Sequence, residues 1–151
     1  MNEKNDNFID GFTYKRLMSV YNFDNELEKL KQAATDAERP IRIINGSEKD
    51  LTAYNNHNNA VVLVQYQAGA MGLNLQKYNK IVYFTPTLSS ELYEQSKKRI
   101  HRIGQQQSCF YYQLICNDSI ELDIYTTLEM RRNYTDDLFK QNYAQYFVQC
   151  F

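Results

Sequence analysis

At 151 residues the chain is long enough for one domain with a hydrophobic core of its own. Charged residues make up 23% of it and the formal net charge is −1, which excludes a protein whose whole surface attracts nucleic acid. Any contact with nucleic acid must come from a local basic cluster, such as Lys97, Lys98 and Arg99.

The three cysteines, Cys109, Cys116 and Cys150, show no Cys-x-x-Cys spacing. The sequence therefore predicts neither a disulfide framework nor a metal site such as a zinc centre. No apolar run approaches the roughly 20 residues that a membrane span needs, and the start of the chain is polar. We expect a protein of the reducing cytoplasm without membrane contact.

Residues 1–12 are polar and rich in asparagine, and we expect them to form a mobile leader. Leu17–Tyr21 has the composition of a first strand. A helix should follow Asp24, because Leu27, Leu30 and Ala34 recur at spacings of three and four, and Pro40 should limit its end.

A second strand is predicted at Ile41–Ile44, and it stops at the turn sequence Asn-Gly-Ser of residues 45–47. Ser47 can cap a short helix over about residues 48–54. Val61–Gln65 is apolar on both faces, as in a strand buried inside a parallel sheet. Small residues then fill positions 67–75, where the glycines allow close approach of a ligand to the backbone.

Residues 81–84 repeat the pattern of a buried strand, and the predicted helix at 89–105 has Ser89 or Ser90 as its cap and Gly104 as its stop. A fifth strand is expected at 110–115. A last helix follows Ser119, and its apolar face should contain Ile120, Ile124, Leu128 and Met130. Strands that alternate with helices predict a mainly parallel α/β sheet with helices on both faces.

Two segments carry a family resemblance. Residues 67–75 (Gln-Ala-Gly-Ala-Met-Gly-Leu-Asn-Leu) resemble motif V, and residues 95–105 (Gln-Ser-Lys-Lys-Arg-Ile-His-Arg-Ile-Gly-Gln) resemble motif VI, of Swi/Snf-like superfamily-two helicase-type ATPases. The second match is the more specific, because these residues fall at the family spacing: Gln95, Arg99, His101, Arg102, Gly104 and Gln105. Residues 20–23 are similar to a diverged motif IV.

The resemblance implies a RecA-like, three-layer fold. It places the second, C-terminal lobe of a helicase at residues 13–133, between the leader and an aromatic tail at 134–151. The tail could dock as an amphipathic helix or stay exposed. The compact set of motifs is similar to helicase-like proteins of phages and mobile elements, so we expect the cytoplasm of a bacterial or phage-infected cell.

On the nucleotide side, the resemblance assigns Arg99 and Arg102 to the γ-phosphate of ATP as arginine fingers. It also assigns Gln95, Gly72 and Asn74 to nucleotide binding. Arginine suits this role because its planar fork stays charged and donates two hydrogen bonds at once. If both arginines lie on a helix, their spacing of three turns them the same way. The alternative is a solvated basic face shared with Lys97 and Lys98.

On the nucleic-acid side, the resemblance implies that Gly46, Ser47, Gln67 and Gly69 contact phosphates of double-stranded DNA. Unpaired amides at a helix start, as expected at Ser47, bind phosphate well. The alternative for Gly46 and Ser47 is a plain turn. The chain departs from the family at Tyr66, where a small hydroxyl residue is usual, and at Lys98, where an acid is usual.

The sequence contains no Gly-x-x-x-x-Gly-Lys-Ser/Thr loop and no acidic run that could hold magnesium after an apolar strand. The chain is thus expected to be half of an ATPase site, inactive without a first lobe that holds Mg²⁺ and the phosphates of ATP. Two functions remain open. One is the second lobe of an ATP-driven DNA translocase, and the other is a stand-alone, non-enzymatic lobe that binds DNA or a protein.

Overall fold

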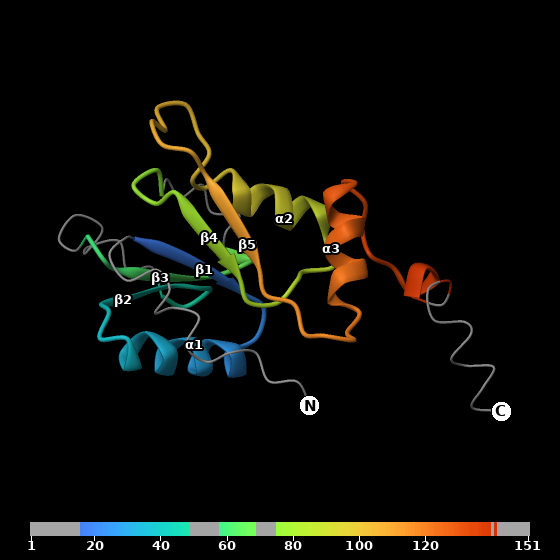
Figure 1. Ribbon diagram of the computed structural model, residues 1–151, viewed down its shortest axis with the longest axis horizontal. Coiled ribbons are helices and arrows are strands. Elements are labelled where there is room, and N and C mark those ends of the chain that lie inside the picture. Colours follow the sequence, from blue (N-terminus) through green and yellow to red (C-terminus); the bar gives the residue numbers. More distant parts are fainter. Residues whose placement is uncertain (1–15, 49–57, 69–74, 140, 142–151) are drawn as a thin grey trace.

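The computed structural model describes residues 16–48, 58–68, 75–139 and 141, and Figure 1 shows how they are arranged. The elements are β1 (Leu17–Tyr21), α1 (Asp24–Asp36), β2 (Ile41–Ile44), β3 (Val61–Gln65), β4 (Lys80–Tyr83), α2 (Ser90–Lys97), β5 (Phe110–Gln113) and α3 (Glu121–Glu129). The strands form one sheet in the order β2-β3-β1-β4-β5, and all pairings are parallel. The prediction of a mainly parallel sheet is confirmed.

Helices cover both faces of the sheet, as in a RecA-like fold (Figure 1). Successive strand residues point to opposite faces, so each buried strand supplies side chains to two layers. This is why β1 is buried along its whole length. The core against α1 contains Leu17, Tyr21, Val61, Leu63 and Val82, and the core against α2 and α3 contains Met18, Val20, Val62, Val64, Ile81 and Tyr83.

The first helix forms as predicted. Leu27, Leu30 and Ala34 are its buried residues. The Glu26 carboxylate accepts hydrogen bonds from the backbone amides of Asn22 (2.7 Å) and Phe23 (3.1 Å), which satisfies donors that a helix start otherwise leaves unpaired.

Two strands differ from their predicted bounds. β4 begins at Lys80 and ends at Tyr83 instead of residue 84, and β5 ends at Gln113 instead of residue 115. β5 is an edge strand whose only described neighbour is β4, and their last pair is Tyr83 with Gln113. Beyond that pair the Leu114 amide still donates to the Tyr83 carbonyl at 3.1 Å, and Ile115 is 37% exposed.

The predicted helix at 89–105 is wrong in its second half, because α2 ends at Lys97. The carbonyl of Arg99 instead accepts from the Leu75 amide at 3.0 Å, and that of Ile100 accepts from the Gln105 side chain at 3.0 Å. Tertiary hydrogen bonds therefore use carbonyls that a longer helix would have needed. The sequence has no helix breaker before Gly104 to reveal this.

The last helix is also shorter than its apolar pattern. Ile124 and Leu128 are buried on α3 as predicted, but Ile120 is 36% exposed and Met130 is 63% exposed. Both lie at the caps and not inside the helix, where the helical spacing no longer decides which side chains are covered.

The predicted helix at about 48–54 falls almost entirely outside the described residues. In the predicted tail, Tyr134 is buried and its amide donates to the Leu88 carbonyl at 3.0 Å. Leu138 and Phe139 pack against the same core. The beginning of the tail therefore docks on the domain, while the proposed boundaries at residues 12 and 133 stay predictions.

Candidate nucleotide and nucleic-acid site

The two predicted arginines lie on a loop, residues 98–105, which we call the arginine loop. It follows α2 and lies at the end of the sheet where β4 begins, since Gln105 in this loop bonds to the carbonyl of Tyr78 at 3.1 Å. The expectation that a helix turns Arg99 and Arg102 the same way is therefore wrong. Loop geometry, not helical spacing, sets where these two side chains lie.

Arg99 is a buried cation. The residue is only 4% exposed, and its Nε has no hydrogen-bond partner in the described part of the chain. Burial lowers the pKa of the Arg99 guanidinium from its ordinary value, and the positive charge of Arg102 lowers it further. A buried charge without an opposite charge is unfavourable, so this site is suited to receive an anion.

Arg102 is half-buried, and its Nε donates to the Lys98 carbonyl at 2.9 Å. Among the described residues, neither Arg102 nor Arg99 forms an ion pair with a carboxylate. The arrangement therefore holds two guanidinium groups that no described carboxylate neutralises, and the charge of Arg102 acts on Arg99. Such a pair can bind phosphate oxygens.

Gln95 lies on α2, one turn before the loop. Its side-chain nitrogen donates to Glu91 at 2.9 Å, and its oxygen is buried without a partner in the described residues. The structure does not join Gln95 to either arginine by a hydrogen bond, so its supporting role stays a prediction.

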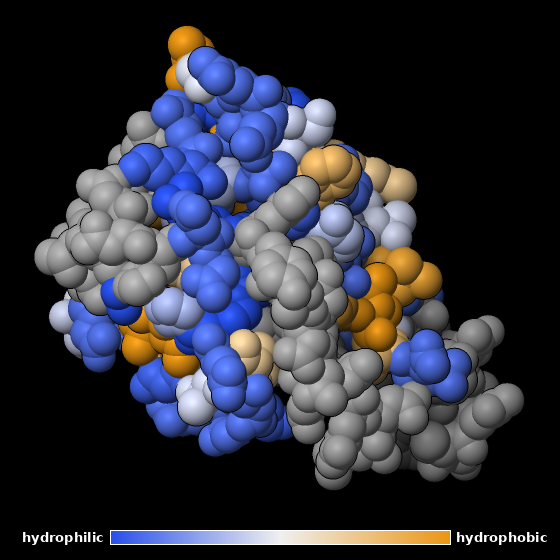
Figure 2. All heavy atoms as spheres, turned by 60° about the vertical axis from the view of Figure 1, so that its left-hand side comes forward, coloured by the Kyte–Doolittle hydropathy of each residue, from blue (hydrophilic) through white to orange (hydrophobic). Residues whose placement is uncertain are grey.

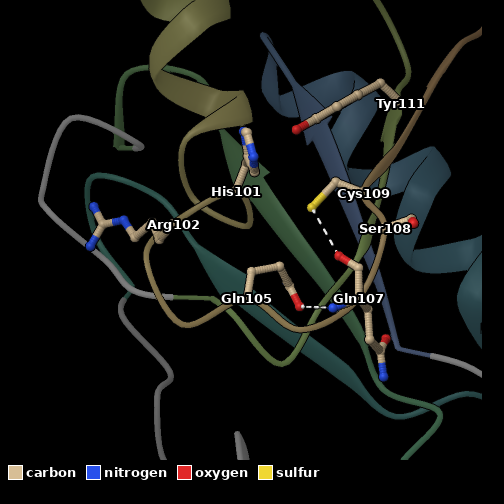
Figure 3. A pocket seen from close by; sticks show the side chains of 7 residues that line it. All are labelled: His101, Arg102, Gln105, Gln107, Ser108, Cys109 and Tyr111. Atoms are coloured by element: carbon tan, nitrogen blue, oxygen red, sulfur yellow. Dashed lines mark hydrogen bonds between the residues drawn. The ribbon is translucent and has the colours of Figure 1, made fainter.

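A hollow of about 400 Å³ lies beside the arginine loop. Figure 3 shows the seven residues that line it: His101, Arg102, Gln105, Gln107, Ser108, Cys109 and Tyr111. Burial raises the pKa of the Cys109 thiol, and burial together with the nearby Cys109 raises the pKa of Tyr111 to about 12. Both groups therefore stay protonated at neutral pH, and the hollow offers hydrogen-bonding groups without an activated nucleophile.

The predicted DNA contacts lie at the opposite end of the sheet, where the parallel strands finish. Gly46 and Ser47 follow the end of β2, Gln67 follows the end of β3, and all three are exposed. The amides of Ser47 (2.9 Å) and Glu48 (2.7 Å) already donate to the Asn45 side chain. The expectation of an unpaired Ser47 amide is therefore wrong, because the asparagine accepts from it first. The Ser47 hydroxyl and Gly46 remain at the surface.

Tyr66 is a core residue. It is buried and stacks on Tyr83 with ring centroids 6.0 Å apart, and its hydroxyl donates to the Thr85 carbonyl at 3.1 Å. The departure from a small hydroxyl residue at this position thus fills the core and leaves no free hydroxyl for DNA.

Three predicted site residues, Gly69, Gly72 and Asn74, lie outside the described residues. Across the described ranges, no group of three or more metal-ligating side chains occurs. No described helix combines the length and the apolar character needed to cross a membrane.

Figure 2 brings forward the side of the molecule where β4 begins. Hydrophilic residues cover most of its described surface, and hydrophobic residues form only small, separate areas there. A surface of this kind suits a charged or polar ligand better than a broad apolar partner.

Known proteins match this chain in sequence. Residues 12–104 match the family of helicase conserved C-terminal domains. The DNA repair and recombination protein RAD26 of Saccharomyces cerevisiae is 33% identical over 102 residues, which cover 68% of this chain and 9% of that protein. The DNA repair protein RAD5 of Eremothecium gossypii is 31% identical over 117 residues, which cover 78% of this chain and 10% of that protein. The chain thus spans about a tenth of the length of these curated relatives.

A viral protein matches as well. A probable global transactivator of Orgyia pseudotsugata multicapsid polyhedrosis virus is 30% identical over 94 residues, covering 57% of this chain and 19% of that protein. A bacterial or phage host stays a prediction, because none of these three relatives comes from a bacterium or a phage.

Among solved structures, the C-terminal part of the Fun30 ATPase domain aligns with a TM-score of 0.70. The alignment covers 87% of this chain and 44% of that chain at 21% identity. At this identity the likeness supports the fold alone.

Proposed function

The chain belongs to the helicase conserved C-terminal domain family, as a C-terminal lobe of the Swi/Snf type, and we propose that it is the second lobe of an ATP-driven translocase on double-stranded DNA. In this proposal Arg99 and Arg102 contact the phosphates of ATP. At the other end of the sheet, where the strands finish, the DNA backbone is contacted by Gly46, Ser47 and the segment from Gln67.

The observation that carries the proposal is the buried Arg99 guanidinium next to Arg102. Neither is neutralised by a carboxylate in the described residues, and the Arg99 Nε has no partner there. A structural arginine in a core would be expected to have its donors satisfied. Phosphate oxygens of a nucleotide would provide both the missing charge and the missing acceptors.

ATP turnover requires a second half of the site. Phosphoryl transfer depends on positioning and on neutralising charge, which a phosphate loop and Mg²⁺ provide together with the arginines. The sequence contains the arginines without a phosphate loop. We therefore propose that a first lobe supplies the loop and the magnesium ligands, and that the chain alone binds ATP weakly.

DNA is proposed as the polymer because the relatives are described as DNA repair and recombination proteins. Contacts from glycine, serine and glutamine to a phosphate backbone carry no sequence information. Motion along DNA without sequence preference needs contacts of this kind. ATP would close the two lobes, and each cycle would move the second lobe along the duplex.

The test is ATP hydrolysis by the chain alone, and by the chain with the matching first lobe, each with and without duplex DNA. We expect no DNA-stimulated turnover by the chain alone and clear turnover by the pair. Robust turnover by the purified chain alone, abolished by Arg102→Ala, would refute the half-site proposal. DNA binding by a pair that never hydrolyses ATP would instead favour a non-enzymatic binding lobe.

A further inference from the structure

The arginine loop is fastened to the segment before β4 by the side chains of Gln76 and Gln105, which we call the glutamine clasp. This fastening matters because the regular helix α2 ends at Lys97. The backbone beyond it forms turns, in which the amides of Ile100 (3.3 Å) and His101 (3.1 Å) donate to the Lys97 carbonyl. At the end of the loop, Gly104 adopts a φ of +99°, a conformation that side-chain-bearing residues rarely adopt. The loop thus leaves the helix at one end and turns sharply at the other.

Gln105 makes most of the bonds of the clasp. Its side-chain nitrogen donates to the carbonyls of Gln76 (2.9 Å), Tyr78 (3.1 Å) and Ile100 (3.0 Å). Its side-chain oxygen accepts from the Gln107 amide at 3.1 Å. The reversed orientation of this amide would place its oxygen against three carbonyl oxygens, so only one orientation fits. A single side chain therefore joins the loop to the chain on both sides of it.

Gln76 and the neighbouring Leu75 hold two further points of the loop. Its side-chain nitrogen donates to the Ile103 carbonyl at 2.6 Å, and the neighbouring Leu75 amide donates to the Arg99 carbonyl at 3.0 Å. The carbonyls that receive these bonds belong to Arg99 itself and to residues directly beside Arg99 and Arg102. The backbone under both guanidinium groups is thereby fixed to the segment before β4.

We propose that Gln105, with Gln76, is a positioning residue that fixes the backbone of Arg99 and Arg102 for contact with phosphate. This inference rests on the proposed function, because it assigns the clasp a role through the two arginines. It also explains why one short loop can carry two cations that no described carboxylate neutralises. Their mutual repulsion would push a free loop apart, and the clasp opposes that movement.

The first experiment uses the 151-residue chain and asks whether the clasp holds the arginine side chain. NMR detects the Nε–H of Arg102, which bonds to the Lys98 carbonyl. Gln105→Met keeps the length of the side chain and removes its donors. We expect the Arg102 Nε–H to exchange with solvent about tenfold faster or more in this variant.

The matched control is Gln106→Met. Gln106 is the next residue, is exposed, and makes no side-chain hydrogen bond with the described residues. The Gln106→Met variant should leave the exchange rate of the Arg102 Nε–H unchanged. If Gln105→Met does not fold, Gln76→Met removes the bond to Ile103 and leaves the Gln105 side chain in place, so it should shift exchange in the same direction by a smaller factor. Unchanged Arg102 exchange in a folded clasp variant would overturn the inference.

The second experiment measures kcat and KM for ATP in the chain paired with its first lobe. Misplacing a catalytic group by about 1 Å can cost about 10²-fold in rate, so Gln105→Met should lower kcat by about that factor while KM changes much less. A purely structural role would lower the melting temperature and leave kcat of the folded protein unchanged. If Arg102→Ala has no effect, the proposed function fails; if only Gln105→Met has none, the positioning role alone fails.

Discussion

The ammonium of Lys97 lies 3.2 Å from a carboxylate oxygen of Glu129 and 4.2 Å from the centroid of the Tyr93 ring. It also lies 3.4 Å from Glu94 on its own helix. These contacts fasten the end of α2 to the end of α3. Lys97 is therefore neutralised inside the domain, whereas Arg102 is not paired with a carboxylate in the described residues. In a diffuse basic surface, Lys97 and Arg102 would be expected to have similar surroundings, and they do not.

Lys97→Ala should destabilise the domain and hardly affect catalysis. The lysine is partly shielded, so losing its ion pairs and its contact with the Tyr93 ring should lower the free energy of unfolding by about 1–2 kcal/mol. Denaturant unfolding measures this change. Lys98→Ala is the control, since Lys98 is exposed and its side chain forms no hydrogen bond or ion pair with the described residues. A stability equal to that of the control would contradict the fastening role.

Arg102→Ala should lower ATP turnover of the two-lobe protein by roughly 10³-fold or more, the range typical of arginine fingers, while the melting temperature stays close to that of the parent. Arg102→Lys should be nearly as damaging, because a point charge cannot replace a planar fork. Turnover is measured at saturating DNA. Equal losses for Lys97→Ala and Arg102→Ala would mean that the region acts only as a basic surface.

Gly46→Ala should separate a structural glycine from one that a ligand approaches. Among the described residues, no atom lies within 4 Å of the position that an added Cβ would take, and the φ of Gly46 is not in the left-handed region. The substitution should therefore leave the melting temperature unchanged.

If the DNA backbone passes close to Gly46, the same variant should bind duplex DNA several-fold more weakly, with an unchanged salt dependence because no charge is removed. Titration of DNA at two salt concentrations measures both quantities. Ser47→Ala tests the neighbouring hydroxyl in the same assay. Unaltered DNA affinity in both variants would favour the plain turn.

The sequence predicted the sheet well because burial on both faces leaves a simple pattern. β1, β2 and β3 have the expected bounds, since a run of apolar residues between turn signals has few other solutions in a parallel sheet. The buried stripe of α1 was equally clear, because Leu27, Leu30 and Ala34 share one helical face.

The arginine loop could not be predicted in the same way. Its motif gave the identity of Arg99 and Arg102, but their conformation depends on hydrogen bonds from Leu75, Gln76 and Gln105. Helical propensity alone favours continuing α2 to Gly104. No local pattern distinguishes Gln76 from other surface glutamines, so its partner could be found only in three dimensions.

The domain should unfold at alkaline pH because of a cluster of buried tyrosines, namely Tyr66, Tyr83, Tyr93 and Tyr125. Rings of this cluster lie with centroids 4.9 to 6.5 Å apart. Burial raises the pKa of each phenol above its ordinary value of 10. The unfolded chain therefore loses these protons first as the pH rises above 10, and the folded state loses stability in that range.

Each such tyrosine removes up to about 1.4 kcal/mol of stability per pH unit above pH 10, so several together should produce a steep transition. Far-ultraviolet circular dichroism follows the fold, and tyrosinate absorbance follows ionisation; both signals should change together. Tyr125→Phe keeps the ring and removes one ionising group, so its unfolding midpoint should move to higher pH. Full tyrosine ionisation near pH 10 with the fold intact would show that the cluster is open to water.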